Sequence, residues 1–494
     1  MKQHAFIRLK IENLWALTVL VGVFVFVNTH PIRPNDFWFH LAYGRILAQT
    51  GHIPTVDSFS FTMAGQPYLS AYNYWLAQLL MYSLFQVGGA EWSILVSALL
   101  VTFAYALILM LNLRQSRNWR LAAAGALFAA MAGITNWNLR PQLLVYPLTA
   151  LSILGMDAFR RGRKRLAWGG LLFAVMVLWV NIHATFFIPL LLATFWLAET
   201  GFHALRRHEP AAILPPLGLL TILLTGTLIN PQGYKVYLYM VQMSRSTVVQ
   251  DYIYEWQPAS LHTTEGMIFF ALLVVFLFVL GIVRPPLSIS RGLSFLFFAV
   301  LAWKYGRAVV WFGLTQAPLL VYALQTGLKR WYPRANPPGR EISVLNTAFA
   351  LILILLTLAS VPWLRGYWPL TVEKQDIYAS ETPVDAAAFM LNRGLPDRVF
   401  ADIGFSSYLI WACEAQCHVF SDPRFDLYPP KIWSDYVQIS AGQKNWEAKL
   451  RAYDVQVLLL SLKTQHALIQ SAKRSSEWVQ IYEDKVAVLF VRRE

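Results

Sequence analysis

The strongest constraint on this chain is a series of long apolar runs that recurs over its first three quarters. The series begins with LWALTVLVGVFVFV (residues 14–27) and ends with ALILILLTLASVPWL (residues 350–364). Most of the runs approach the ~20 residues that a helix needs to cross a bilayer. With 56% hydrophobic and 14% charged residues, the composition is too apolar for an ordinary soluble domain. The sequence therefore predicts a mainly α-helical, polytopic transmembrane bundle over residues 1–366.

Net charge separates this membrane part from the tail. Residues 1–365 hold 27 Lys and Arg against 11 Asp and Glu, a balance of +16, whereas the last 129 residues hold 14 against 16, a balance of −2. The overall charge of +14 therefore belongs to the membrane part. Basic cytoplasmic loops account for it, and no nucleic-acid partner is expected.

Basic residues occupy every second connection between the apolar runs, which sets the expected topology. The first run lacks a small-residue cleavage pattern, so we expect an uncleaved helix with a cytoplasmic N-terminus. The intervening connections are then outside: residues 29–72, 136–141, 181–183, 230–265 and the turn near Lys304 and Arg307. We expect a multi-pass protein of the cytoplasmic (inner) membrane with an extracytoplasmic tail.

The expected number of helices follows from the two ends of the chain. Twelve apolar segments are visible, but an inside N-terminus and an outside tail require an odd number of crossings. The segment YNYWLAQLLMYSLFQV (residues 72–87) is short and ends at Gly88-Gly89, so we expect a re-entrant or interfacial helix there. The prediction is eleven crossings, with thirteen as the alternative.

A polar and aromatic stretch, RPNDFWFHLAYGR (residues 33–45), follows the first apolar run directly. Asp36 and His40 share one face if this stretch is helical. The alternative is that Asp36 only caps the helix and that its aromatic rings are interfacial anchors. The carboxylates of the outer connections are Asp36, Asp57, Glu91, Asp251, Glu255 and Glu265. Asp36 and Glu255 are the main candidates for proton transfer, because neighbouring aromatic rings can desolvate them.

Two arginines stand at the outer membrane border, against the positive-inside trend. Arg140 lies in NWNLRPQ, and Arg307 lies in WKYGRAVVW together with Lys304. A charged residue is a functional candidate where both the cost of charge near the membrane and the positive-inside rule disfavour it. A guanidinium suits an interfacial anion such as a lipid phosphate. The alternative is that these side chains only extend to lipid headgroups.

Several motifs occur together along the chain. They are an Asp after the first helix, the block HLAYGRIL…TGHIPTVDSFSFTMAGQPYLSAYNYWLAQLL, the short motifs RPQ, NIHATF, LINPQGY and YEW, a late membrane-border Arg, and the tail segment YLIWACEAQCHVFSDPRFDLY. In this combination the chain resembles bacterial members of the GT-C superfamily, polytopic glycosyltransferases that use polyprenyl-phosphate-linked sugars. It departs from the commoner pattern by carrying SAYNYW where many relatives have a His-Glu-Trp-like string.

The resemblance implies inverting transfer of a sugar from a polyprenyl-phosphate-linked donor to a hydroxyl of a glycan, lipid or protein acceptor on the outer membrane face. Asp36 would be the general base, with His40 and Glu255 as further catalytic residues. The donor phosphate would be bound by Arg140, Arg307 and Lys304. Substrate contacts are implied for Trp38, Arg45, Asn181, His183, Asn230 and Trp256.

No cluster at metal-ligand spacing and no Asp-x-Asp pair is visible in the membrane part, so no cofactor is expected, although some relatives use a divalent metal. Two other functions stay open. The chain could be a transporter or flippase in which Asp36, Arg140 and Arg307 line a substrate path, or a non-catalytic assembly protein for lipid-linked glycans. The lack of a visible internal repeat and the outer domain disfavour the transporter.

Residues 367–494 are predicted to form a small extracytoplasmic α/β domain. The predicted strands are RVFADIG (398–404), CHVFSD (417–422), VQVLLLSL (455–462), WVQIYED (478–484) and VAVLFVRR (486–493), the last two as a hairpin, and the predicted helices are PVDAAAFMLNRG (383–394), NWEAKLRAY (445–453) and TQHALIQSAKRS (464–475). The two cysteines of the chain, Cys413 and Cys417, are expected to form a disulfide in an oxidising compartment. Asp422 and Arg424 either reach the active site or hold a turn by their own salt bridge.

Overall fold

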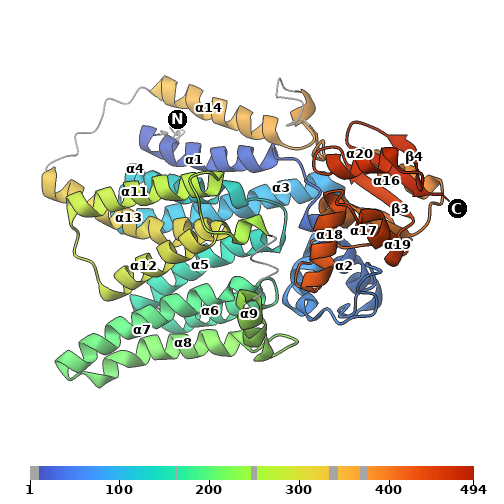
Figure 1. The fold of residues 1–494 in the computed structure, drawn as a ribbon. Coiled ribbons are helices and arrows are strands. Elements are labelled where there is room, and N and C mark those ends of the chain that lie inside the picture. The colour runs from blue at the N-terminus through green and yellow to red at the C-terminus, as the bar shows by residue number, and fades with distance from the viewer. Residues whose placement is uncertain are drawn as a thin grey trace.

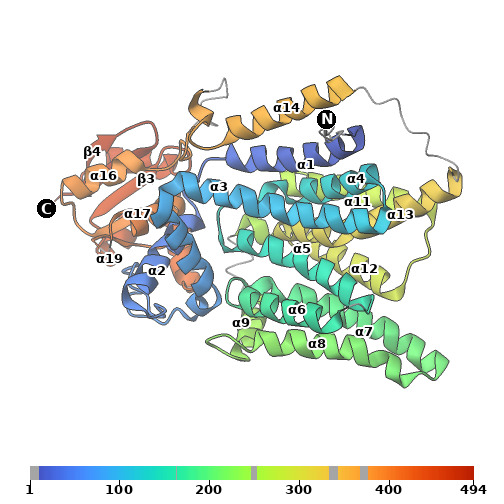
Figure 2. The same cartoon turned by 180° about the vertical axis from the view of Figure 1, so that it is seen from behind.

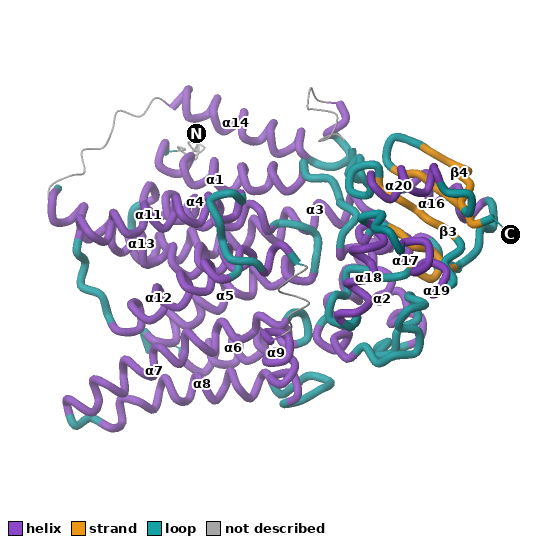
Figure 3. The backbone as a smooth tube through the Cα atoms, in the orientation of Figure 1, coloured by secondary structure: helices purple, strands orange, loops and turns teal. Residues whose placement is uncertain are grey.

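The computed structural model describes residues 10–162, 164–245, 253–332, 343–367, 376–414 and 416–493. Long helices make up one part of the molecule, and the strands lie in a smaller part at one end of them (Figures 1 and 3). Seven helical segments of the described chain are long and apolar enough to cross a membrane. The predicted fold class, a transmembrane helical bundle followed by an α/β domain, is confirmed.

The apolar runs form helices that lie roughly side by side in the two views (Figures 1 and 2). These helices are α1 (Ile11–Asn28), α3 (Trp75–Ser116), α4 (Trp119–Gly133), α5 (Pro141–Arg160), α6 (Arg165–Val180), α7 (Phe187–Arg207), α8 (Leu214–Thr227), α11 (Thr264–Val283), α12 (Ile289–Lys304), α13 (Val309–Trp331) and α14 (Ser343–Ser360). Residues from all of these helices except α14 form one continuous apolar core. Because the molecule is seen without a membrane, the number of crossings and their direction stay predictions.

Helix α3 is kinked at Gly88-Gly89. Gly89 has a φ of +68°, a left-handed conformation that favours glycine, and a Cβ on Gly88 would lie 2.8 Å from the Cβ of Trp92. The part of α3 before the kink packs on the outer connection, since Met81 and Phe85 contact the aromatic side chains that follow α1. The part after the kink joins the bundle. The re-entrant or interfacial helix expected at residues 72–87 stays a prediction.

Shorter elements connect the long helices. They are α2 (Asp36–Thr50), η1 (Leu69–Asn73), η2 (Ile134–Asn136), η3 (Ala184–Phe186), η4 (Pro210–Ile213), α9 (Lys235–Arg245), η5 (Tyr254–Trp256), η6 (Gly306–Ala308) and η7 (Arg365–Tyr367). Helix α2 confirms that the stretch after the first run is helical. Asn35 caps it by accepting a hydrogen bond from the amide of Phe37. The capping role considered for Asp36 is therefore filled by Asn35.

The tail forms a mixed five-stranded sheet with the order β2-β1-β3-β5-β4. Its strands are β1 (Arg398–Ala401), β2 (His418–Val419), β3 (Val457–Ser461), β4 (Trp478–Glu483) and β5 (Ala487–Arg492), and its helices are α16 (Val384–Asn392), α17 (Ile403–Ala412), α18 (Pro430–Ser440), α19 (Trp446–Ala452) and α20 (His466–Arg474). Strand β1 pairs in parallel with β2 and β3, and β5 pairs antiparallel with β3 and β4. All five predicted strands and the terminal hairpin are present.

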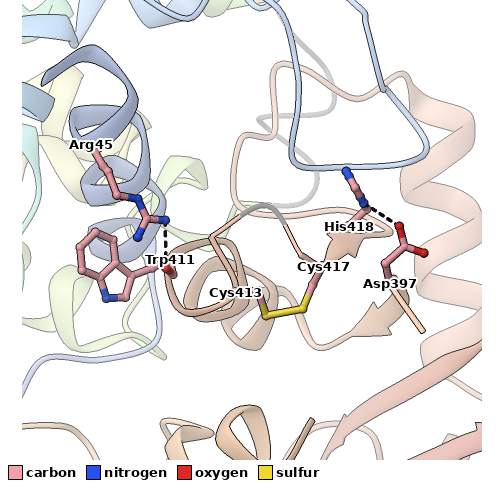
Figure 4. The surroundings of a disulfide bond; sticks show 6 residues. All are labelled: Arg45, Asp397, Trp411, Cys413, Cys417 and His418. Carbon is pink, nitrogen blue, oxygen red and sulfur yellow. Dashed lines mark hydrogen bonds and ion pairs between the residues drawn. A yellow bond between two sulfur atoms is a disulfide. The ribbon is translucent and has the colours of Figure 1, made fainter. Parts of the chain in front are cut away.

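Two helices of the tail were not predicted, α17 and α18. The sequence predicts that the first strand, RVFADIG, continues to residue 404, but β1 ends at Ala401. The reason is local, because the carboxylate of Asp402 accepts a hydrogen bond from the amide of Gly404 and caps α17. The predicted disulfide between Cys413 and Cys417 is confirmed and joins the end of α17 to the start of β2 (Figure 4).

The first outer connection packs into the core of the tail. Phe39, Tyr43, Phe59 and Tyr68 belong to the same apolar cluster as the buried residues of β1, β3 and β5. Backbone hydrogen bonds join Phe61 and Phe59 to Val419 of β2. The aromatic rings of α2 are therefore buried within the protein, and the alternative that they are interfacial anchors is wrong.

A buried ion-pair cluster holds the first outer connection against the tail. Arg424 lies 2.6 Å from Asp57 of the first connection and 2.5 Å from Asp422 of the tail, and all three side chains are 0% exposed. Asp57 also accepts hydrogen bonds from the amides of Phe59 and Ser60, which is the turn chemistry expected of it. Of the two alternatives for Asp422 and Arg424, the salt bridge between them is present, and Asp57 is a further partner that the sequence did not reveal.

Candidate functional site

A pocket lies where the bundle meets the tail, at the ends of several connections. It contains six of the residues that the sequence singled out: Asp36, His40, Arg140, His183, Trp256 and Arg307. They come from α2, the start of α5, the α6–α7 turn, η5 and η6. The tail completes the lining with Pro423, Arg424, Phe425 and Asp426. Packing thus gathers side chains from connections that are far apart in the sequence.

Arg140 is the centre of the charged part of the pocket. Its two terminal nitrogens contact both carboxylate oxygens of Glu255, at 2.8 and 2.5 Å. Its Nη1 also lies 3.8 Å from a carboxylate oxygen of Asp36. The side chains of Arg140, Asp36 and Glu255 are 14%, 35% and 29% exposed. This cluster is therefore accessible to a ligand, with Asp36 as its most open member.

Local structure explains how these side chains are presented. Arg140 precedes Pro141, the first residue of α5, and has an extended backbone with φ −157°. Asp36 is the first residue of α2, directly after the Asn35 cap. Backbone hydrogen bonds from Gly306 to Gln257 and from Ala259 to Trp303 join the η5 and η6 connections. Each of these charged side chains therefore lies at the end of a helix or in a connection whose position is fixed by other contacts.

The two carboxylates differ in proton affinity. Burial raises the pKa of Asp36, with Arg140 opposing and Glu255 adding to this rise. Burial also acts to raise the pKa of Glu255, but the bidentate contact with Arg140 outweighs it and lowers that pKa to about 2. Two carboxylates whose pKa values are driven apart suit different roles. Asp36 is the one suited to exchange a proton, whereas Glu255 stays ionised.

Arg307 forms a second cationic part of the pocket. Its Nη2 donates to Oε1 of Gln142 at 2.9 Å, and its guanidinium lies 5.1 Å from the ring centre of Trp256. Within the described part of the chain, no carboxylate lies within ion-pair distance of it. The Nε2 of buried Gln142 has no partner in the described residues either. The charge of Arg307 is therefore not balanced by a described carboxylate, and the Nε2 of Gln142 has no acceptor among the described residues.

The histidines of the pocket are neutral. Burial and then the charge of Arg140 lower the pKa of His40 to about 3, and burial and Arg307 lower the pKa of His183 well below its usual value. Nδ1 of His40 contacts Nε2 of Gln78 at 3.2 Å. The ring of Tyr74 lies between the two histidines, with centroid distances of 5.7 and 5.8 Å. Together they form a polar aromatic wall beside the charged cluster.

Solved structures resemble the whole chain. The crystal structure of the Archaeoglobus fulgidus oligosaccharyltransferase in the apo form has a TM-score of 0.53 at 12% identity, covering 97% of this chain and 74% of that one. The mycobacterial arabinofuranosyltransferase AftD (mutant R1389S) has a TM-score of 0.57 at 14% identity, covering 96% and 41%. The chain has the GT-C fold. No protein-family model and no curated protein matches the sequence.

Five of the predicted binding residues lie outside the described lining of the pocket: Trp38, Arg45, Asn181, Asn230 and Lys304. The buried Trp38 donates from its indole to the carbonyl of Arg33. Arg45 pairs with Glu414 at 2.7 Å. Its guanidinium also lies 4.6 Å from the ring centre of Trp411 (Figure 4). Both side chains therefore contact residues at the interface between α2 and α17 and do not line the pocket.

The other three have structural contacts of their own. Asn181 accepts from the indole of Trp75 and donates to the carbonyl of Ile229, so it ties three connections together. Asn230 closes its own turn through the amide of Gln232. Lys304 ends α12, exposed, with its ammonium 5.2 Å from the ring of Tyr305. Their roles in binding stay predictions, and Asp251 lies outside the described residues.

The sequence did not single out Asp426, which the tail contributes to the pocket. Its carboxylate accepts a hydrogen bond from the hydroxyl of Ser70 and is buried, which raises its pKa. Asp426 belongs to the motif SDPRFD, in which the sequence predicts roles only for Asp422 and Arg424. A signal was present, because the motif holds three acid or base residues and only two of them neutralise each other. Among the described residues, no group of three or more His, Cys, Asp or Glu is placed to hold a metal ion.

Proposed function

We propose that this protein is an inverting membrane glycosyltransferase that moves a sugar from a polyprenyl-phosphate-linked donor to an acceptor hydroxyl in this pocket. The observation that supports the proposal most is the convergence of Asp36, Arg140 and Arg307 from three distant connections. A base and two guanidinium groups are what transfer from a phosphate leaving group requires. The GT-C fold agrees with this chemistry, and we place it on the outer face of the cytoplasmic membrane.

In this mechanism Asp36 is the general base. The acceptor oxygen forms a bond to the anomeric carbon while its proton passes to the carboxylate of Asp36. The carbon–oxygen bond to the phosphate breaks through an oxocarbenium-like state, and the lipid phosphate leaves with the electron pair. Because the carboxylate of Asp36 is 35% exposed, it is open to a hydroxyl from the pocket. Its raised pKa makes it a better proton acceptor than an ordinary aspartate.

The arginines have separate roles. Arg307 binds the donor phosphate, because no described carboxylate pairs with it and its donors point into the pocket. Arg140 is held by Glu255 in a bidentate pair, so its main effect is to fix the position and charge of Asp36. Glu255 is accordingly a positioning residue. The leaving phosphate gains negative charge in the transition state, which Arg307 and then Arg140 stabilise.

Binding of polyprenyl phosphate to the purified full chain in detergent tests the phosphate role. Arg307→Gln should weaken binding by about 10- to 100-fold, the effect of losing one charge-assisted hydrogen bond. Lys235→Gln is the control, since Lys235 is an exposed base of an outer connection that lies outside the described lining of the pocket, and it should change affinity by less than about twofold. Unchanged affinity in Arg307→Gln would contradict the assignment.

A further inference from the structure

A second cavity lies between α5, α7, α12 and α13, away from the pocket. Its volume is about 700 Å³. It is lined by the C-terminal part of α5 and the N-terminal part of α12, whereas the pocket is lined by residues next to the other ends of these two helices. About 20 Å of helix separate Arg291 at this cavity from Lys304 at the other end of α12. The charge pattern of the connections assigns this end to the cytoplasmic side.

The charged side chains of this cavity fall into two groups. Arg160 pairs with Glu199 at 3.5 Å and Arg161 with Asp157 at 3.0 Å, so these four largely neutralise one another. Arg291 differs, since its guanidinium lies 3.9 Å from the ring centre of Tyr322 and no described carboxylate lies within ion-pair distance. The cavity therefore keeps one cation whose charge the described residues do not balance.

Gln316 provides a second unsatisfied group in the same cavity. The side chain is 1% exposed, and its Nε2 donates to the hydroxyls of Ser294 and Thr315 at 3.1 and 3.0 Å. Its Oε1 has no hydrogen-bond partner in the described residues. A buried acceptor without a partner costs free energy, which a ligand that donates a hydroxyl hydrogen would recover.

The rest of the lining is largely apolar. Leu111, Ile153, Leu192, Phe195 and Leu319 face the cavity beside these polar groups. We propose that this cavity binds an anionic phospholipid with a hydroxyl-bearing headgroup from the cytoplasmic leaflet. Arg291 holds the phosphate, Gln316 accepts from the headgroup hydroxyl, and the apolar side chains contact the acyl chains. The assignment does not depend on the chemistry of the outer pocket.

Native mass spectrometry of the full chain in detergent tests this proposal, with phosphatidylglycerol and phosphatidylethanolamine of identical acyl chains. Phosphatidylglycerol should be retained preferentially, and Arg291→Gln should reduce its apparent affinity at least fivefold. Arg284→Gln is the control, because Arg284 lies in the same basic connection but not in the cavity lining, and it should bind like the wild type. Arg291→Lys should recover part of the lost affinity.

Gln316→Leu gives a second readout that does not remove charge. It should abolish the preference for phosphatidylglycerol over phosphatidic acid, which lacks the headgroup hydroxyls, while the affinity for phosphatidic acid is kept. Equal retention of phosphatidylglycerol by the wild type and Arg291→Gln would overturn the proposal. Equal losses in Arg284→Gln and Arg291→Gln would also overturn it, as would full displacement of the lipid by soluble glycerol phosphate.

Discussion

Two clusters of this protein have the same composition, one arginine and two carboxylates, but opposite surroundings. Arg140 and Asp36 line the pocket, Glu255 pairs with Arg140 beside it, and the three side chains are 14 to 35% exposed. Arg424 with Asp57 and Asp422 is 0% exposed and holds the first connection against the tail, although Arg424 also belongs to the lining of the pocket. The accessible cluster keeps one carboxylate at 3.8 Å from its arginine, whereas both carboxylates of the buried cluster are within 2.6 Å.

The difference between the clusters shows how geometry assigns a role to the same residue types. A buried charge without a partner is costly, so the Arg424 cluster has to be fully paired and is suited to holding two segments together. The accessible cluster can leave Asp36 incompletely paired, because water or a substrate can contact it. Incomplete pairing is what lets burial raise the pKa of Asp36. Composition alone does not separate an accessible cluster from a buried one.

The largest expected effect is on catalysis. Asp36→Asn should lower kcat for sugar transfer by about 10²- to 10⁴-fold, because the base can no longer take the acceptor proton. Polyprenyl-phosphate binding and the thermal unfolding midpoint should stay near the wild-type values. Transfer assays on the purified protein measure the first effect and detergent-phase thermal unfolding the second. Wild-type transfer by Asp36→Asn would exclude Asp36 as the base.

An Asp-to-Asn substitution in the buried cluster should mainly affect stability instead of catalysis. Asp57→Asn removes one partner of the fully buried Arg424 and should destabilise the folded state by about 3–5 kcal/mol. The unfolding midpoint should fall by on the order of 10 °C. Arg140→Met, in the accessible cluster, should lower the midpoint less. Equal midpoints for Asp57→Asn and the wild type would show that the two clusters do not differ as proposed.

A smaller change should appear in the pH profile of Glu255→Gln. The base works only when ionised, so kcat/KM should fall as the pH drops through the raised pKa of Asp36. Glu255 adds to that pKa by charge repulsion, and its removal also frees Arg140 to approach Asp36. Both changes lower the pKa of Asp36, so the acidic limb should move to lower pH. A limb that stays in place or moves to higher pH would contradict this coupling.

The smallest effect is expected at a surface pair. Arg45 is 11% exposed, but its partner Glu414 is 68% exposed, so solvent screens this ion pair and it contributes little to stability. Arg45→Gln should change stability by about 1 kcal/mol or less and transfer by less than about twofold, measured in the same two assays. A large loss of transfer would restore the substrate-binding role that the sequence implied for Arg45.

Much of the fold could be predicted because it depends on neighbouring residues. A crossing helix requires about 20 apolar residues in a row and a strand requires a short apolar run, and both patterns are local. The disulfide was also predictable, since Cys413 and Cys417 are separated by four positions. Asp36, Arg140 and Arg307 stood out because charge at a membrane border is costly. These features were determined by the sequence itself.

Only the tertiary structure decided which of these groups meet. Arg140 and Glu255 are 115 residues apart, and Ser70 and Asp426 are 356 apart, so no local period connects them. Packing also turned Trp38 and Arg45 away from the pocket while bringing Asp426 into it. Ion pairing and desolvation depend on distance in space, and that distance is set only when the helices and the tail pack together.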